Sequence, residues 1–265
     1  MSLPAYATLR FERPAEHVLL VVLNRPEMLN ALDTQMGRDL LDLWTRIGAE
    51  PEELRCVVLT GAGDRAFCAG GDLKERDGMT DEAWRAQHEL FERMFMAQVE
   101  CSVPLIAAAN GHAYGGGLEM LLCCDFAYAA SGARFALSEV SLGIMPGGMG
   151  TQNLPRALGE RRAKELILAA RVFSATEALA WGLLNQVCEA PQLLEAALAS
   201  ARQIAANAPL SVRQAKKSIH YGLQTDLLTG YRFEIEAYSR LIGSEDRREG
   251  VRAFNEKRKP RFRGR

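Results

Sequence analysis

Two glutamates and a run of three glycines are the residues whose types and spacing best suit catalysis. Gly115, Gly116 and Gly117 lie between two apolar runs, and Glu119 follows two residues later. A turn without Cβ atoms lets the backbone approach a ligand closely. The helix that we expect to follow offers unpaired N–H groups and the positive end of its dipole at the same point. Such a turn can bind a phosphate or stabilise a developing oxyanion.

An oxyanion suits this glycine turn better than a phosphate. The segment has neither a G-K-[ST] ending nor a G-x-G-x-x-G pattern. Glu119 on the first helical turn would repel a phosphate, whereas an acid or base beside an oxyanion site serves proton transfer. The structural alternative, a tight turn whose glutamate complements the helix dipole, stays open on these residues alone.

Glu139 is the second candidate acid or base. We expect one short helix and one short strand between Glu119 and Glu139. A helix of ~8 residues advances ~12 Å and a returning strand of ~5 residues covers ~16 Å, so the two lengths nearly cancel. A single glutamate in a loop is usually solvated, and only this pairing makes Glu139 a catalytic candidate.

The elements that must position these residues alternate between strand and helix. Apolar β-branched runs predict strands, and apolar spacing at three and four residues predicts helices. After Gly159 the strand signals fade and helical patterns dominate. The chain is therefore predicted to have an α/β body with mostly parallel pairing, residues 1–195, which holds the active site, and a helical C-terminal region, residues 196–265. Expected strands are 18–23, 56–59, 105–109 and 126–130, and expected helices are 34–48, 81–100, 160–170, 176–181, 192–207, 209–222 and 225–241.

Composition excludes several classes of protein. The 265 residues carry a formal net charge of −1, so no global field attracts nucleic acid or an anionic membrane. The six cysteines form no C-x-x-C pair and the four histidines are scattered, so we expect no metal site and a reducing compartment. The first six residues lack the pattern of a signal peptide, and no apolar run approaches the roughly 18–20 residues of a membrane span. A cytoplasmic protein is expected.

Three other features suggest different chemistry. The basic tail, residues 257–265, allows an alternative hypothesis of a nucleic-acid-binding module, although the neutral overall charge argues against it. Cys68 would need a histidine base to act as a nucleophile, and the sequence places none beside it. His112 lies in a turn with no partner in view.

The sequence resembles the crotonase (enoyl-CoA hydratase/isomerase) superfamily along nearly its whole length. Five segments carry the resemblance in order, and they are residues 24–32, 67–73, 110–119, 146–156 and 246–258. The resemblance implies a spiral of ββα units with a helical C-terminal trimerisation region. It also implies a homotrimer or a dimer of trimers.

The resemblance also assigns roles to individual residues. It implies an oxyanion hole made by the N–H groups of Gly71 and Gly116, with Glu119 activating a water and Glu139 delivering a proton to Cα. Coenzyme A enters as part of an acyl-CoA thioester substrate, so no separate cofactor is expected. The residues expected to contact the CoA part are Arg25, Met28, Ala31, Ala69, Asp72, Leu73 and Lys74.

The two glutamates favour an enoyl-CoA hydratase within this superfamily. Hydratases of the family carry glutamates at both positions, whereas many isomerases keep only one, and isomerase activity remains the alternative. Residues 67–76 and 164–167 resemble methylglutaconyl-CoA hydratases, which would place the enzyme in leucine breakdown rather than in straight-chain β-oxidation. Ser138 stands where many hydratases have proline, which affects the expected shape of the acyl pocket.

Overall fold

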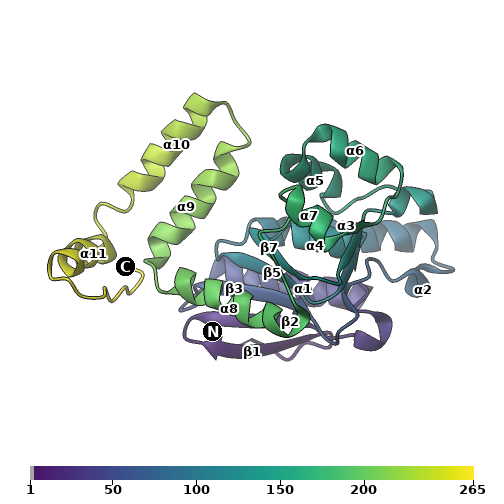
Figure 1. Ribbon diagram of the computed structural model, residues 1–265, viewed down its shortest axis with the longest axis horizontal. Coiled ribbons are helices and arrows are strands. Elements are labelled where there is room, and N and C mark those ends of the chain that lie inside the picture. The colour runs from purple at the N-terminus through teal and green to yellow at the C-terminus, as the bar shows by residue number, and fades with distance from the viewer. Residues whose placement is uncertain (1–2) are drawn as a thin grey trace.

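A mostly parallel sheet forms the centre of the body. The computed structural model describes residues 3–265, so Met1 and Ser2, part of the segment tested for a signal peptide, lie outside the described residues. Within that range the larger sheet has the order β1-β2-β3-β5-β7-β10, with β1 antiparallel to β2 and the other neighbours parallel (Figure 1). The strands are β1 (Leu9–Ala15), β2 (Val18–Leu23), β3 (Cys56–Gly61), β5 (Leu105–Ala109), β7 (Phe126–Ala130) and β10 (Gln186–Cys188).

A second sheet of short strands completes a repeating unit of two strands and a helix. Its order within the described residues is β4-β6-β8-β9, and β4, β6 and β8 follow β3, β5 and β7 of the larger sheet along the chain. A helical segment comes after each such pair of strands. This repeat of two strands and a helix is the predicted spiral of ββα units, and the fold prediction is confirmed. The short strands are β4 (Ala66–Cys68), β6 (His112–Tyr114), β8 (Arg134–Ala136) and β9 (Phe173–Ser174).

The larger sheet is buried on both faces, as expected for parallel pairing. Alternate residues of β2 divide between two apolar clusters, because successive strand side chains point to opposite faces. Leu19, Val21 and Leu23 pack in the cluster that contains α1 (Thr34–Ala49) and α3 (Asp81–Val99). Residues 18, 20 and 22 pack in the cluster that contains α8 (Ala190–Ala205). The active-site elements are thereby attached to a rigid double-faced sheet.

The C-terminal helices project away from this body (Figure 1). They are α9 (Pro209–Gly222), α10 (Leu227–Ser239) and α11 (Glu245–Asn255). Their surface carries large exposed apolar side chains, including Leu223, Leu227 and Phe254. Exposed apolar surface of this extent is typical of protein contact sites. It agrees with a trimerisation region, which stays a prediction, and the predicted boundary after residue 195 lies inside α8.

The helix predictions are largely confirmed, whereas short strands were missed. Residues 209–222 form a helix with the predicted bounds, and 81–100 and 225–241 match α3 and α10 closely. β10 has three residues and joins the sheet beside β7 although local strand signals have faded there. The remaining helices of the described chain are α2 (Leu73–Arg76), α4 (Gly116–Leu122), α5 (Gly150–Leu158), α6 (Glu160–Leu168) and α7 (Ala175–Ala180), with 3-10 turns η1 (Pro26–Met28) and η2 (Glu139–Leu142).

Residues 3–265 contain neither a membrane-spanning helix nor a cluster of metal-ligating side chains. No helix there has the length and apolar character needed to cross a membrane. No group of three or more histidine, cysteine, aspartate or glutamate side chains there is arranged to hold a metal ion.

Candidate active site

The three glycines at positions 115–117, at the start of α4, differ in how well the backbone would tolerate a side chain. Gly115 has φ +49° and ψ −126°, a backbone conformation that L side chains rarely adopt. Gly117 packs so tightly that a Cβ would lie 2.1 Å from the carbonyl oxygen of Cys68. Gly116 is different, because a Cβ there would meet nothing closer than 3.8 Å. A Cβ at Gly116, the first residue of α4, would therefore make only ordinary van der Waals contacts.

The backbone nitrogens of Gly71 and Gly116 lie close to each other, and both residues line the same cavity. A Cβ on Gly116 would lie 3.9 Å from the nitrogen of Gly71. An isolated bridge pairs Gly71 with Leu32, but its hydrogen bonds join Leu32 to the Gly70 oxygen (2.7 Å) and the Asp72 nitrogen (3.0 Å). The Gly71 N–H takes no part in that bridge, and the Gly116 N–H is in the unpaired first turn of α4. Two donors that form none of these backbone bonds therefore lie close together at one place.

That point opens on a cavity of about 600 Å³. Both candidate glutamates line it together with both glycines, so the predicted convergence of Glu119 and Glu139 is observed. Its other lining residues are mostly apolar or aromatic, and they are Leu32, Ala69, Gly70, Leu73, Arg76, Trp84, His88, Phe91, Phe95, Tyr114, Gly115, Ser138, Leu142, Ile144, Met145, Pro146, Gly147 and Gly148. A mostly apolar cavity with a few convergent polar groups is the usual form of a small-molecule site.

Glu119 is held in a fixed orientation from behind. Its Oε1 accepts hydrogen bonds from the N–H groups of Gly148 (2.7 Å) and Gly150 (2.8 Å), which come just before α5 and at its start. The side chain is buried. Burial raises the pKa of Glu119 to about 7, with a smaller contribution from the charge of Glu139, while the two N–H donors act in the opposite direction. Both bonds go to Oε1, which leaves Oε2 for a water or a substrate.

Glu139 has the opposite character, because part of its carboxyl group has no partner. It begins the 3-10 turn η2, and its Oε1 lies beside the backbone of Gly115, 3.2 Å from where a Cβ would be. Its Oε2 is buried and forms no hydrogen bond. Burial raises the pKa of Glu139 above its ordinary value. An unpaired buried carboxyl oxygen is costly unless it is protonated or meets a ligand, so this group suits proton delivery.

We expect Glu119→Gln to make the protein more resistant to unfolding at alkaline pH. A carboxyl group with a folded-state pKa near 7 and an ordinary value of 4.5 favours the folded state when protonated, so its stability contribution falls as pH rises between those values. That interval corresponds to roughly 3 kcal/mol. The glutamine has no proton to lose, and its oxygen can accept the same two N–H groups.

Urea unfolding curves of the wild type and of Glu119→Gln, recorded at the same protein concentration, would measure this effect. The stability difference between variant and wild type should grow by about 2 kcal/mol between about pH 5 and about pH 8. A difference that stays constant with pH would show that Glu119 titrates normally in the folded chain.

The structure ties Arg25 and Asp72 to each other. Arg25 forms ion pairs with Asp33 (3.2 Å) and Asp72 (3.0 Å), and its Nη1 donates to the oxygen of Ala31 at 2.6 Å. Asp72 also caps α2 by accepting from the N–H groups of residues 74 and 75. Arg25 therefore joins the segment after β2 to the loop that carries Gly71, and its charge is already matched by two carboxylates.

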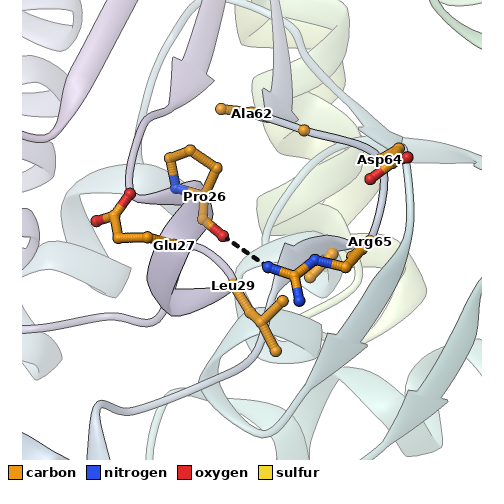
Figure 2. Close-up of a pocket in the computed structure, with 8 residues that line it drawn as sticks. Pro26, Glu27, Leu29, Ala62, Asp64 and Arg65 are labelled. Atoms are coloured by element: carbon orange, nitrogen blue, oxygen red, sulfur yellow. Dashed lines mark hydrogen bonds between the residues drawn. The ribbon is translucent and has the colours of Figure 1, made fainter.

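The other residues expected to contact CoA are distributed over the same region. Ala69 and Leu73 line the catalytic cavity, whereas Lys74 is exposed on α2 and Met28 is half-buried in η1. A second pocket, of about 290 Å³, lies between η1 and the loop after β3, and Figure 2 shows the residues that line it. There Arg65 donates to the oxygen of Pro26 at 3.4 Å. The predicted CoA contacts stay predictions.

Sequence reasoning missed several residues of the cavity. Gly148 and Gly150 belong to a segment that carried the family resemblance, but nothing in it indicated that their N–H groups hold Glu119. Arg76, Trp84 and Phe91 form one wall of the cavity and were not predicted to be functional. An apolar face of the helix 81–100 that includes a tryptophan was the available signal. Cys68 is fully buried, and burial raises the pKa of its thiol to about 11, so a nucleophilic role is excluded.

Comparison with known proteins agrees with this fold. Residues 13–265 match the enoyl-CoA hydratase/isomerase family, and the chain belongs to that family of enzymes. It is 44% identical over 249 residues to the putative enoyl-CoA hydratase/isomerase YngF of Bacillus subtilis, covering 94% of this chain and 95% of that protein. The crystal structure of an enoyl-CoA hydratase from Bacillus anthracis superposes with a TM-score of 0.95 at 43% identity, covering 97% of this chain and all of that one.

A relative also bears on the finer resemblance seen in the sequence. The mitochondrial methylglutaconyl-CoA hydratase of Mus musculus is 39% identical over 251 residues, covering 93% of this chain and 80% of that protein. This identity is lower than that to YngF, whose name leaves the reaction open. Overall identity therefore does not select a substrate.

Proposed function

We propose that this chain is an enoyl-CoA hydratase that adds water across the 2,3 double bond of an enoyl-CoA thioester. The observation that carries the proposal is the convergence of two buried carboxyl groups and two unpaired backbone N–H groups on one cavity. Each group has a separate task in this reaction. Coenzyme A is part of the substrate, and the mechanism requires no other cofactor.

The N–H groups of Gly71 and Gly116 would hydrogen-bond the thioester oxygen. They draw electron density from the double bond and stabilise the enolate as water attacks Cβ. Donors fixed in the backbone stabilise such charge without reorganising at the moment of reaction. The apolar lining of the cavity strengthens these hydrogen bonds by lowering the local dielectric.

The two glutamates would transfer the protons. Glu119 accepts a proton from the attacking water, and Glu139 delivers a proton to Cα. The reactive pair then holds one proton in total, and the two groups titrate as a pair. The N–H groups that fix Glu119 Oε1 aim its free oxygen, while the unpaired Glu139 Oε2 is the oxygen available for proton delivery.

Two alternatives differ in the use of these carboxyl groups. An isomerase would shift the double bond and needs a proton relay but no bound water. A nucleic-acid-binding module would use the basic tail, but Arg258 is paired with Glu249 and Glu256, and the backbone of residues 263 and 264 donates to Asp246. The tail is folded against α11 with part of its charge matched, which favours a structural role.

We also propose that the chain assembles as a homotrimer or a dimer of trimers.

The direct test is to follow loss of the conjugated-thioester absorbance with crotonyl-CoA and 3-methylglutaconyl-CoA. Rapid loss with formation of the 3-hydroxyacyl product supports the hydratase, and the faster substrate distinguishes general hydration from the leucine-breakdown reaction. A product with a shifted double bond would establish the isomerase instead.

The hydration rate should fall as pH rises above about 7. The pKa of Glu119 is about 7 because of its burial and the charge of Glu139, so the last proton leaves the pair near that pH. Above it both carboxyl groups are ionised and none can supply the proton to Cα. We expect kcat/KM to decrease about tenfold per pH unit in that range. Measurement between about pH 5 and about pH 9 checks this, and a rise through pH 7 would show that only ionised Glu119 limits the rate.

A further inference from the structure

The guanidinium of Arg76 lies in the wall of the catalytic cavity, beside the proposed oxyanion hole. Arg76 ends the single-turn helix α2, five residues after Gly71. A Cβ on Gly71 would lie 3.2 Å from Nη1 and 3.3 Å from Cζ of Arg76. Glycine at position 71 thus leaves room for the guanidinium to approach the reacting end of the substrate.

Three side chains of α3 hold the guanidinium in place. Its Cζ lies 4.5 Å from the centre of the Trp84 ring and 5.7 Å from that of Phe91. Its Nε donates to Oε1 of Gln87 at 2.8 Å. Aromatic faces attract a cation and also remove water from it, so the group is oriented before any ligand arrives.

The charge of Arg76 is not matched by an ion pair. Among the described residues its hydrogen bond is the one from Nε to Gln87, and no carboxylate lies within ion-pair distance of its two Nη groups. Burial lowers the pKa of Arg76, and only the more distant charge of Glu75 opposes this. Glu75 Oε2 already accepts from the Thr34 N–H and from Gln87 Nε2. A half-buried guanidinium that has no ion-pair partner favours binding of an anionic ligand.

We propose that Arg76 binds a carboxylate on the acyl chain, so that the preferred substrates are enoyl-CoA thioesters whose acyl group carries a negative charge. The inference rests on the proposed function, because it places the thioester oxygen at the Gly71 and Gly116 N–H groups. Arg76, whose guanidinium lies beside Gly71, is then next to the thioester end of the acyl chain.

Two features select an acyl carboxylate over the phosphates of coenzyme A. The long pantetheine arm separates those phosphates from the thioester, whereas Arg76 contacts the residue that would bind the thioester oxygen. Arg76 is also the only arginine or lysine among the described residues that line the cavity. Its planar pair of Nη groups matches both oxygens of a carboxylate.

A matched pair of substrates tests this inference. Glutaconyl-CoA and (E)-2-pentenoyl-CoA differ only in a terminal carboxylate or methyl group. The wild type should hydrate glutaconyl-CoA with a kcat/KM at least about tenfold higher, and Arg76→Met should lower this selectivity ratio by about 10- to 100-fold, as expected for loss of a charged hydrogen bond. Arg76→Lys should retain part of the ratio, because it keeps the charge and loses the planar fork.

The control variant is Arg85→Met, which removes an exposed arginine of α3 outside the cavity and should leave the ratio unchanged. A wild type that prefers pentenoyl-CoA, or an Arg76→Met ratio equal to that of the wild type, would overturn the inference while leaving the hydratase proposal intact.

Direct binding separates this failure from failure of the proposed function. Glutaryl-CoA and pentanoyl-CoA are saturated, so calorimetry measures their affinities without any reaction. Tighter binding of glutaryl-CoA that is lost in Arg76→Met supports the inference even if neither enoyl thioester is hydrated. Equal affinities of both thioesters for the wild type would refute it.

Discussion

Replacement of Glu139 by Gln is expected to reduce kcat for hydration by about 10³-fold, because it removes the group proposed to deliver a proton to Cα. Glu139 is buried, and its Oε2 has no hydrogen-bond partner within the described residues. Glutamine has nearly the same shape, so the cavity should keep its form. Substrate affinity should change little, since the glutamate acts in proton transfer rather than in CoA binding.

The measurement is a pair of progress curves with the conjugated thioester, together with calorimetric binding of a saturated acyl-CoA. Glu195→Gln on the exposed surface of α8 is the matched control and should behave as the wild type. Equal kcat values for Glu139→Gln and the wild type would remove Glu139 from the mechanism. A loss of acyl-CoA binding parallel to the loss of kcat would instead indicate a damaged cavity.

Replacement of Gly116 by Pro is expected to lower kcat/KM by about 10²- to 10³-fold, the usual effect of losing one oxyanion-hole donor. Proline at the first position of a helix is tolerated, because the N–H that it removes has no partner within the helix. Gly116 occupies that position in α4. The substitution therefore removes the proposed donor while the helix is kept.

Gly116→Ala is the matched control for this substitution. It keeps the N–H, and its Cβ would meet no heavy atom closer than 3.8 Å. Activity of the alanine variant close to that of the wild type, beside a strong loss in the proline variant, would assign the effect to the N–H. Equal losses in both variants would show that the space in front of Gly116, rather than its donor, matters to the reaction.

The sequence alone predicted those parts of the fold that depend on local patterns. The helix at residues 209–222 begins with Pro209 and ends at Gly222, and both signals act within one turn. The apolar run at residues 18–23 predicted a strand, which is confirmed, and its side chains divide between two buried clusters. The ordered segments that resemble the crotonase superfamily supplied the spiral arrangement, which periodicity could not.

The sequence was less informative about short elements. β10 and β9 have three and two residues, and each is a strand only because a partner lies beside it. Pairing partners of this kind are set by the whole chain, so a propensity for strand within the segment itself is not required.

The candidate site divides in the same way. The type and order of Glu119, Glu139 and the glycine turn were evident from the sequence, because residue type and close spacing are local properties. The partners of Arg25 and the surroundings of Arg76 were decided only by the tertiary structure. Arg25 was expected to contact the CoA part, and only the structure shows its pairing with Asp72, 47 residues away. Arg76 gained its position from the aromatic residues of α3.

The sequence by itself therefore determined which family this chain belongs to and which groups are available for acid, base and oxyanion chemistry. Only the tertiary structure decided their states. The pKa of Glu119 depends on burial and on N–H groups from residues 148 and 150, about 30 positions along the chain. The tertiary fold decides whether a charged group is desolvated, paired or available to a ligand. The reason is that these states depend on neighbours that come from distant parts of the sequence.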